Sequence, residues 1–163
     1  MDKELKEGKF FLARDGFRKI KKEYEKLSVL KKEKLAEKIS PVFDSEEVDA
    51  EFVSFREEIE FLDKRLIELE YILKNFEFIK IPPKQNRDRV FLGAVVIVKQ
   101  GEKEKEFMVV DSLEADPNLG KISCRSPLGC ALLGKKVGDK IILDSPKRTV
   151  YEIKAIRYDK KLL

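Results

Sequence analysis

The first half of the chain carries a helical stripe of apolar residues that runs without a break from Val48 to Phe76. Apolar side chains recur there at alternating steps of four and three, which is the seam of a coiled coil over about four heptads. The stripe contains Val48, Phe52, Phe55, Ile59, Leu62, Leu66, Leu69, Leu73 and Phe76. At 1.5 Å per residue, we expect a helix on the order of 40 Å long.

A weaker stripe precedes this one and predicts a first helix from about Asp15 to Ile39. Its apolar members are Phe17, Ile20, Tyr24, Leu27, Leu35 and Ile39. Lys31 and Lys34 stand where apolar residues would continue the stripe, and Pro41 ends the helix because proline cannot donate the next backbone hydrogen bond. The two stripes together predict an antiparallel helical hairpin, whose far turn runs from Ser40 to Glu51.

The hydrophobic pattern changes from helical to β-like after Ile81-Pro82-Pro83. Tandem prolines cannot continue a helix and favour an extended linker at this point. We therefore expect a helical domain over residues 1–80 and a second domain over 81–163. Short β-like runs follow, separated by Gly, Asn, Asp and Pro turns. They are Val90–Val98, Glu106–Val110, Lys121–Cys124, Lys140–Leu143 and Val150–Ile156.

One short helix is predicted between the third and fourth of these runs. Ser126 can cap it, Pro127 fits its first position and Gly134 ends it. The second domain should therefore be a small antiparallel sheet with one short helix, which makes the whole chain α+β.

Composition narrows the function classes. Charged residues make up 40% of the 163 residues, and no segment approaches the roughly 18 apolar residues of a membrane span. The start lacks the apolar stretch of a signal peptide, so we expect a cytoplasmic protein. The chain has no histidine, and Cys124 and Cys130 have no neighbouring pair, which excludes a zinc site and histidine-based catalysis. Reduced, partly buried thiols are expected.

Charge divides the hairpin into a basic arm and an acidic arm. From Arg14 to Lys38 there are ten Lys and Arg against five Asp and Glu, whereas Asp44 to Glu70 holds eleven acids against three basic residues. Five acids gather at the turn between the arms: Asp44, Glu46, Glu47, Asp49 and Glu51. Like charges repel at such a tip unless a cation meets them.

Several motifs of the second domain follow a known family pattern in order and nearly in spacing. They are Glu114-Ala115-Asp116-Pro117, Gly120-Lys121-Ile122-Ser123, Ser126-Pro127-Leu128 and the run from Ala131 to Asp139. The first arm and the segment Ala50-Glu51-Phe52 match as well. On these residues the chain resembles the bacterial Gre transcript-cleavage factors over nearly its whole length. The resemblance implies an FKBP-like fold for the second domain.

The resemblance also implies a task for the acidic turn. Gre factors insert their coiled coil into the secondary channel of bacterial RNA polymerase and place two acids beside the catalytic Mg²⁺, and the polymerase then cleaves backtracked RNA. Such a protein is not itself an enzyme and shares its Mg²⁺ with the polymerase. Asp44 and Glu47 keep the family's spacing and are the candidates for metal delivery, with Glu46 and Asp49 as substitutes. The family's glycine and asparagine are missing here, and one residue is inserted after Glu47.

Asp44 and Glu47 have a second interpretation, because an acid followed three positions later by Glu is also a capping box for the return helix.

Two further sets of residues have roles implied by the resemblance. The candidates for contact with RNA phosphates are four basic residues of the first arm, Arg18, Lys19, Lys22 and Lys26. A solvated lysine-rich helix face explains these residues equally well. The candidate docking surface for the polymerase is formed by Ser126, Pro127 and Leu128. These residues also fit a purely structural role.

Three functions compete at this point. The first is a transcript-cleavage factor for RNA polymerase, expected to be a monomer because the hairpin satisfies its own seam. The second is a Gre-like inhibitor that blocks the same channel, with which the rearranged acidic turn is compatible. The third is a peptidyl-prolyl isomerase or chaperone, suggested only by the implied FKBP-like fold.

Overall fold

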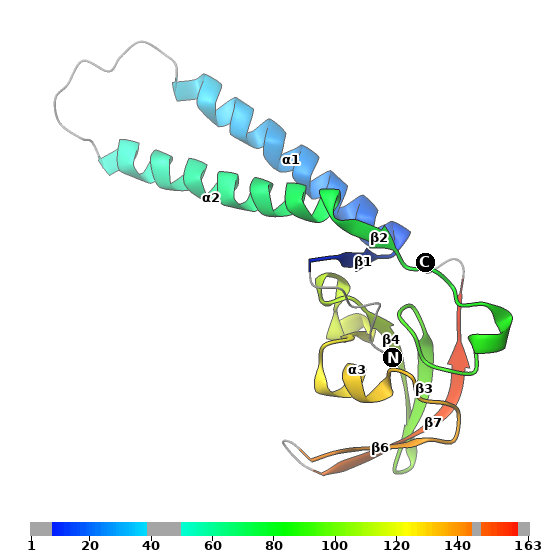
Figure 1. Cartoon of the computed structure of the whole chain (residues 1–163). Coiled ribbons are helices and arrows are strands. Elements are labelled where there is room, and N and C mark those ends of the chain that lie inside the picture. Colours follow the sequence, from blue (N-terminus) through cyan, green and yellow to red (C-terminus); the bar gives the residue numbers. More distant parts are fainter. Residues whose placement is uncertain (1–7, 39–49, 145–147, 160–163) are drawn as a thin grey trace. The chain divides into compact units, whose positions relative to one another are not determined.

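The computed structural model describes residues 8–38, 50–144 and 148–159 (Figure 1). Two long helices lie near the start of the described chain, and most strands follow them. The helices and strands are β1 (Phe10–Leu12), α1 (Arg14–Lys38), α2 (Ala50–Lys74), β2 (Phe76–Phe78), β3 (Val95–Gln100), β4 (Lys103–Val110), β5 (Lys121–Ser123), α3 (Pro127–Leu132), β6 (Lys140–Leu143) and β7 (Thr149–Arg157). Three 3₁₀ turns, η1 (Lys84–Asn86), η2 (Ser112–Glu114) and η3 (Pro117–Leu119), connect them.

The chain divides into two compact units, so the predicted combination of a helical hairpin with a sheet and one short helix is confirmed. The hairpin unit is Phe17–Asn75, and the sheet unit contains the residues before and after it. The segment ahead of Phe17 thus groups with the sheet, whereas the sequence prediction assigned it to the helical domain. No helix in the described part of the chain is long and apolar enough to cross a membrane.

The hairpin consists of α1 and α2, each of 25 residues, lying side by side (Figure 1). The predicted seam of α2 faces inward: Leu62 and Leu69 are buried, and Phe55, Ile59, Leu66 and Leu73 are half-buried. Phe52 is 41% exposed, and Val48 lies outside the described residues. In α1, Leu35 was expected to resume the stripe but is 38% exposed, and Ile39 and Pro41 are outside the described residues.

The helical prediction is wrong at Phe76, which belongs to β2. The side-chain amide of Asn75 donates to the carbonyl of Tyr71 at 2.8 Å, and the Asn75 N–H donates to the same carbonyl at 3.1 Å, which closes the last turn of α2. The next residues then pair in parallel with β1, so that Phe10 lies opposite Phe76 and Leu12 opposite Phe78.

The main sheet has the strand order β5-β4-β3-β7-β6. Its β3–β4, β3–β7 and β6–β7 pairs are antiparallel, as predicted. The prediction is wrong for β5, which runs parallel to β4. The turns η2 and η3 carry the chain back before β5 begins, and Asp116 pairs with Lys121 across that return.

The apolar core lies between the sheet and α3. Side chains alternate between the two faces of a strand, so Val96 and Val98 of β3 face α3 while Val95 faces the other way. Leu132 of α3 is fully buried against the first face. On the second face, Val95, Met108 and Val110 pack with Ile79 and with Phe11 of β1.

Candidate functional site

The acidic turn is bounded by the two helix ends that the structure describes, Lys38 of α1 and Ala50 of α2. Asp44, Glu46, Glu47 and Asp49 lie outside the described residues. Their roles in metal delivery or in helix capping therefore stay predictions. Within the described residues, no group of three or more Asp, Glu or Cys side chains is arranged to hold a metal ion.

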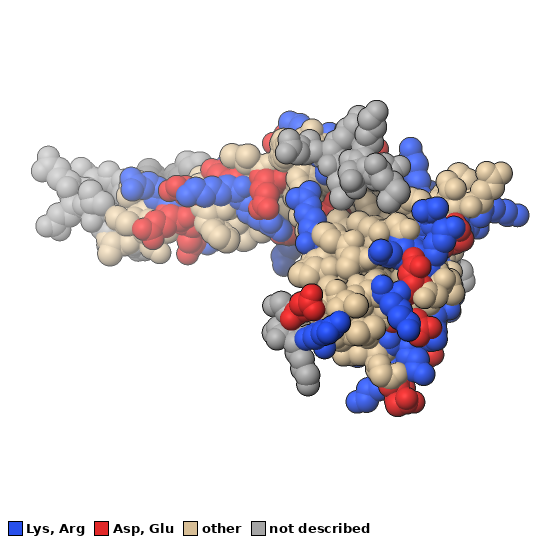
Figure 2. Space-filling view, turned by 60° about the horizontal axis from the view of Figure 1, so that its bottom comes forward, with Lys and Arg blue, Asp and Glu red and all other residues tan. Residues whose placement is uncertain are grey.

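The four candidate RNA-contacting residues lie on one face of α1. At 3.6 residues per turn, Arg18, Lys19, Lys22 and Lys26 fall within an arc of about 100°, on the side opposite the half-buried Phe17, Ile20 and Tyr24. All four are exposed. Figure 2 shows Lys and Arg side chains interspersed with Asp and Glu along the hairpin. The structure thus gathers these four cations on a solvent-facing strip that a polyanion can approach.

The three candidate docking residues open helix α3, and their environments differ. The Ser126 hydroxyl accepts from the Gly129 N–H at 3.1 Å and donates to the Ser123 carbonyl at 2.7 Å, which confirms the predicted N-cap. Leu128 is half-buried against the core, whereas Pro127 at the helix start is exposed. The structural role is therefore met by Ser126 and Leu128, and Pro127 is the member that faces solvent.

The position of α3 depends on a close backbone approach. A Cβ atom on Gly129 would lie 2.0 Å from the Ser123 carbonyl oxygen, so only glycine allows the helix to sit this close to β5. The Ser123 hydroxyl lies 2.8 Å from that of Ser112 and accepts from the Arg125 N–H at 3.0 Å. These contacts fix the conformation of the turn between β5 and α3 through three polar side-chain and backbone groups.

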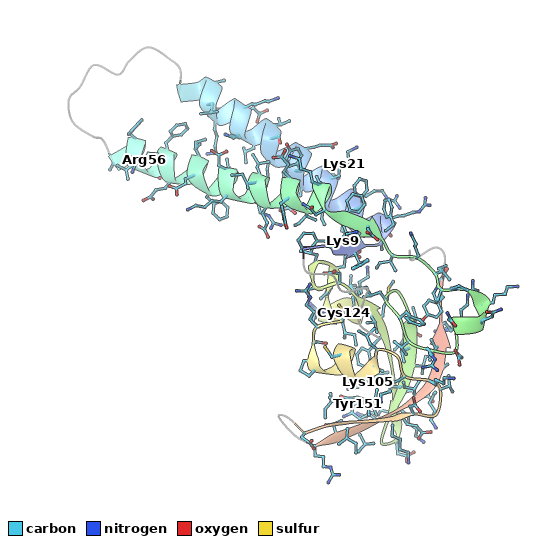
Figure 3. All side chains as sticks on the ribbon, viewed as in Figure 1. Lys9, Lys21, Arg56, Lys105, Cys124 and Tyr151 are labelled. Carbon is cyan, nitrogen blue, oxygen red and sulfur yellow. The ribbon has the colours of Figure 1, made fainter. Side chains whose placement is uncertain are left out.

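The two cysteines have different environments, although both are free. Cys124 is buried on the α3 side of the sheet (Figure 3), and burial raises the pKa of its thiol. Cys130 is exposed on α3, and its thiol donates to the Cys124 carbonyl at 3.0 Å. The sequence predicted partly buried thiols, whereas the structure has one buried cysteine, Cys124, and one exposed cysteine, Cys130.

Two carboxylates that sequence reasoning did not single out tie the start of α1 to the sheet unit. Asp111, which is 2% exposed, accepts from the Phe11 N–H at 3.1 Å. Glu114 accepts from the Ala13 N–H at 2.8 Å, directly ahead of α1. Gly16 makes room for this carboxylate, because a Cβ atom there would lie 2.0 Å from Glu114 Oε1. Glu114 thus caps a helix about 100 residues earlier in the sequence.

Comparison with known proteins adds to this geometry. The family model described as "Transcription elongation factor, GreA/GreB, C-term" matches residues 84–158. Transcription elongation factor GreA of Clostridium acetobutylicum is 36% identical over 156 residues, which is 93% of this chain and 98% of that protein. The chain belongs to the GreA/GreB family of transcription elongation factors.

Two further comparisons concern a relative and a solved structure. Transcription elongation factor GreA of Chlorobaculum parvum is 37% identical over 89% of this chain and 94% of its own length. The solved structure of GreA factor homolog 1 of Thermus thermophilus is 24% identical, covers 91% of this chain and 99% of its own, and gives a TM-score of 0.40. The region matched by the family model contains both α3 and the carboxylates Asp111 and Glu114.

Proposed function

We propose that this GreA/GreB protein binds bacterial RNA polymerase, inserts its helical hairpin into the secondary channel and stimulates Mg²⁺-dependent cleavage of backtracked RNA. The observation that carries the proposal is the hairpin itself. Two helices of 25 residues, each about 37 Å long at 1.5 Å per residue, flank a segment that contains Asp44, Glu46, Glu47 and Asp49. Carboxylates on such a rod can enter an active site that a globular protein cannot reach.

The donor set suits the metal. Mg²⁺ is a hard cation that prefers oxygen ligands, and Asp44 and Glu47 supply carboxylate oxygens. Asp44 and Glu47 would hold the ion, and its charge would serve to activate water and to stabilise negative charge on the phosphate. The protein's own contribution is to hold carboxylates at the right reach, and it performs no catalysis without the polymerase.

The remaining candidate residues serve binding in this proposal. The basic strip Arg18, Lys19, Lys22 and Lys26 contacts phosphates of the backtracked RNA through salt-sensitive ion pairs. Pro127, which is exposed at the start of α3, contacts the polymerase near the channel entrance. Ser126 and Leu128 act indirectly by holding Pro127 in place.

A backtracked elongation complex tests the proposal. With protein and Mg²⁺ added, we expect the RNA to shorten from its 3′ end much faster than with Mg²⁺ alone. Suppressed RNA synthesis without shortening would instead indicate the channel-blocking inhibitor. A protein that neither binds polymerase nor alters either reaction would leave the prolyl isomerase or chaperone to be assayed.

A further inference from the structure

The inner face of the hairpin changes character along its length. In the C-terminal half of α2 the contacts are apolar, since Leu62, Leu69 and Ile72 are 6%, 0% and 2% exposed. Toward the ends that flank residues 39–49, Leu35 is 38% exposed and Phe52 is 41% exposed. The half of the hairpin next to the acidic turn has half-buried apolar residues such as Phe55 and Ile59 but less apolar burial than the other half.

Two lysines occupy the inner face of α1 in this half. Lys34 Nζ lies 2.5 Å from Glu58 Oε2 of α2, and Lys31 forms an ion pair with Asp63 of α2. Lysine and carboxylate chains fill the space less completely than apolar side chains would. Consistent with this, a surface hollow of 420 Å³ opens at the level of Lys34, lined by residues of both helices that include Leu30 and Phe61.

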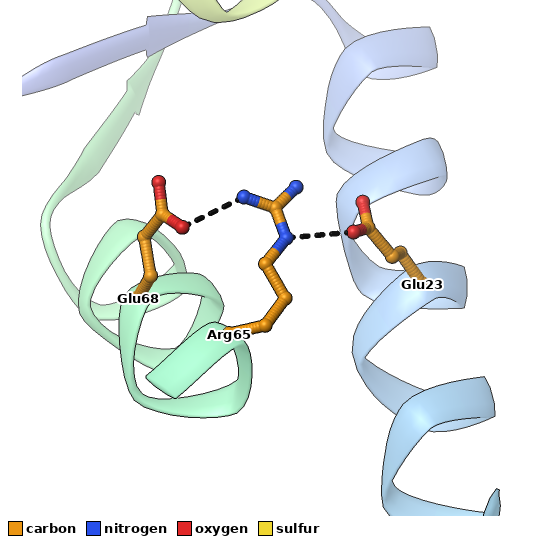
Figure 4. A network of polar contacts seen from close by, with 3 residues as sticks. All are labelled: Glu23, Arg65 and Glu68. Atoms are coloured by element: carbon orange, nitrogen blue, oxygen red, sulfur yellow. Dashed lines mark hydrogen bonds and ion pairs between the residues drawn. The ribbon is translucent and has the colours of Figure 1, made fainter. Parts of the chain in front are cut away.

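A third connection marks the border with the apolar half. Arg65 of α2 donates from Nε to Glu23 of α1 at 2.8 Å and from Nη1 to Glu68 at 2.7 Å (Figure 4). Hydrogen bonds to Glu23 and Glu68 raise the pKa of the Arg65 guanidinium, which stays charged at any ordinary pH. Lys34 lies eleven positions after Glu23 in α1, or about 16 Å farther along the helix.

These three contacts, Lys34–Glu58, Lys31–Asp63 and Arg65–Glu23, are the cross-arm pairs. Their side chains are between 30% and 53% exposed. Pairs of this exposure change a local opening equilibrium by only about two- to fivefold each, and salt screens them over about 8 Å at physiological ionic strength. Apolar contacts lack this sensitivity to salt. Closure of the hairpin next to residues 39–49 should thus depend on salt more strongly than closure near Leu69, where apolar burial dominates.

We propose that Lys31, Lys34, Glu58 and Asp63 are positioning residues, which hold the ends of α1 and α2 together at Lys38 and Ala50 and so set the reach of the acids between them. This inference rests on the proposed function. A chain of eleven residues, 39–49, connects the two helix ends, and separating those ends would spread the acids over a wider range of positions. Salt then lowers transcript cleavage through the hairpin itself, in addition to its effect on RNA binding.

The first test uses the free protein and amide hydrogen exchange. Lys34→Glu and Glu58→Lys each place like charges across the arms, and we expect exchange in residues 28–38 and 50–58 to rise about two- to fivefold. Exchange around Leu69 should stay unchanged. The double variant K34E/E58K restores the opposite charges and should restore protection. High salt should reproduce the effect of the single variants in the wild-type protein.

A matched control separates cross-arm pairing from a change in helix charge. Glu60 pairs with Lys64 within α2 at 2.8 Å, so Glu60→Lys makes the same charge change as Glu58→Lys without touching α1. Equal exchange in both variants, or no recovery in the K34E/E58K double variant, would overturn the inference.

The second test is the cleavage assay at saturating concentrations of each variant. Lys34→Glu should lower the maximal cleavage rate about two- to fivefold while the concentration for half-maximal effect changes little, and K34E/E58K should restore the rate. A change confined to half-maximal concentration would show a role in binding and refute positioning. If the wild-type protein stimulates no cleavage, the proposed function fails, and the exchange pattern alone decides whether the cross-arm pairs hold the hairpin closed.

Discussion

The two units of this protein are stabilised in different ways. In the sheet unit, Val96, Val98, Val109, Leu132 and Ile153 are all fully buried between the sheet and α3. In the described part of the hairpin unit, only Leu62, Leu69 and Ile72 are buried, and toward the acidic turn ion pairs supplement half-buried apolar residues. A helix in a two-helix rod has one neighbour, so at most one stripe of its surface leaves water. The sheet unit therefore owes its stability to desolvation, and the hairpin relies partly on charge.

The largest difference should appear when one leucine is truncated in each unit. Leu132→Ala removes a fully buried side chain from a packed core and should cost about 2 to 5 kcal/mol, because a cavity is left behind. Leu66→Ala removes a half-buried chain from the hairpin seam and should cost about 1 kcal/mol, since its site is already partly hydrated. The loss in unfolding free energy of each variant is measured by urea denaturation, with hydrogen exchange reporting on each unit separately. Equal costs would contradict the distinction between the two units.

A smaller effect is expected where the sheet unit caps α1. Glu114→Gln keeps the shape of the side chain but removes the charge that accepts from the Ala13 N–H at the positive end of the helix dipole. We expect faster exchange in the first turn of α1, corresponding to about 1 kcal/mol. Glu104→Gln, an exposed acid on β4, is the control and should leave α1 unchanged. The capping role is refuted if the two variants behave alike.

Tyr158 provides a test of comparable size that depends on pH. Its hydroxyl donates to the Arg89 carbonyl at 2.6 Å and accepts from the Phe91 N–H at 2.9 Å, so Tyr158→Phe should cost about 1 kcal/mol. Burial raises the pKa of this phenol to about 12 from its ordinary value of 10.0. Because the folded protein favours the neutral form, this stabilisation is complete below pH 10 and is lost as the pH rises toward 12.

Absorbance of tyrosinate and unfolding at alkaline pH measure that linkage. In Tyr158→Phe, the stability should no longer fall at alkaline pH because of this phenol. In Tyr71→Phe, which changes a hairpin residue that is 51% exposed, the alkaline fall in stability should remain. A wild-type protein in which every tyrosine titrates near pH 10 would contradict the buried environment of Tyr158.

How far the sequence predicted each feature depends on whether its signal is local. The seam of α2 from Phe55 to Leu73 and the cap at Ser126 repeat or complete within a few residues, and both were predicted correctly. The parallel pairing of β5 was missed because strand direction depends on how η2 and η3 return the chain. The contacts of Asp111 and Glu114 join residues about 100 positions apart, so no local pattern announces them. Gly16 was a local sign of these contacts, because a glycine in the first turn of a helix suggests that another group approaches the backbone closely there.

We propose that the sheet unit contacts the polymerase through Pro127 while the acids of the hairpin turn promote cleavage. The most direct measurement compares polymerase binding and transcript cleavage for the double variant Asp44→Asn, Glu47→Gln. Both substitutions keep side-chain size and remove the negative charge by which a carboxylate attracts Mg²⁺. The account predicts unchanged polymerase affinity and a loss of cleavage of at least about tenfold, equivalent to about 1.4 kcal/mol in the barrier. Full cleavage by the double variant would contradict it.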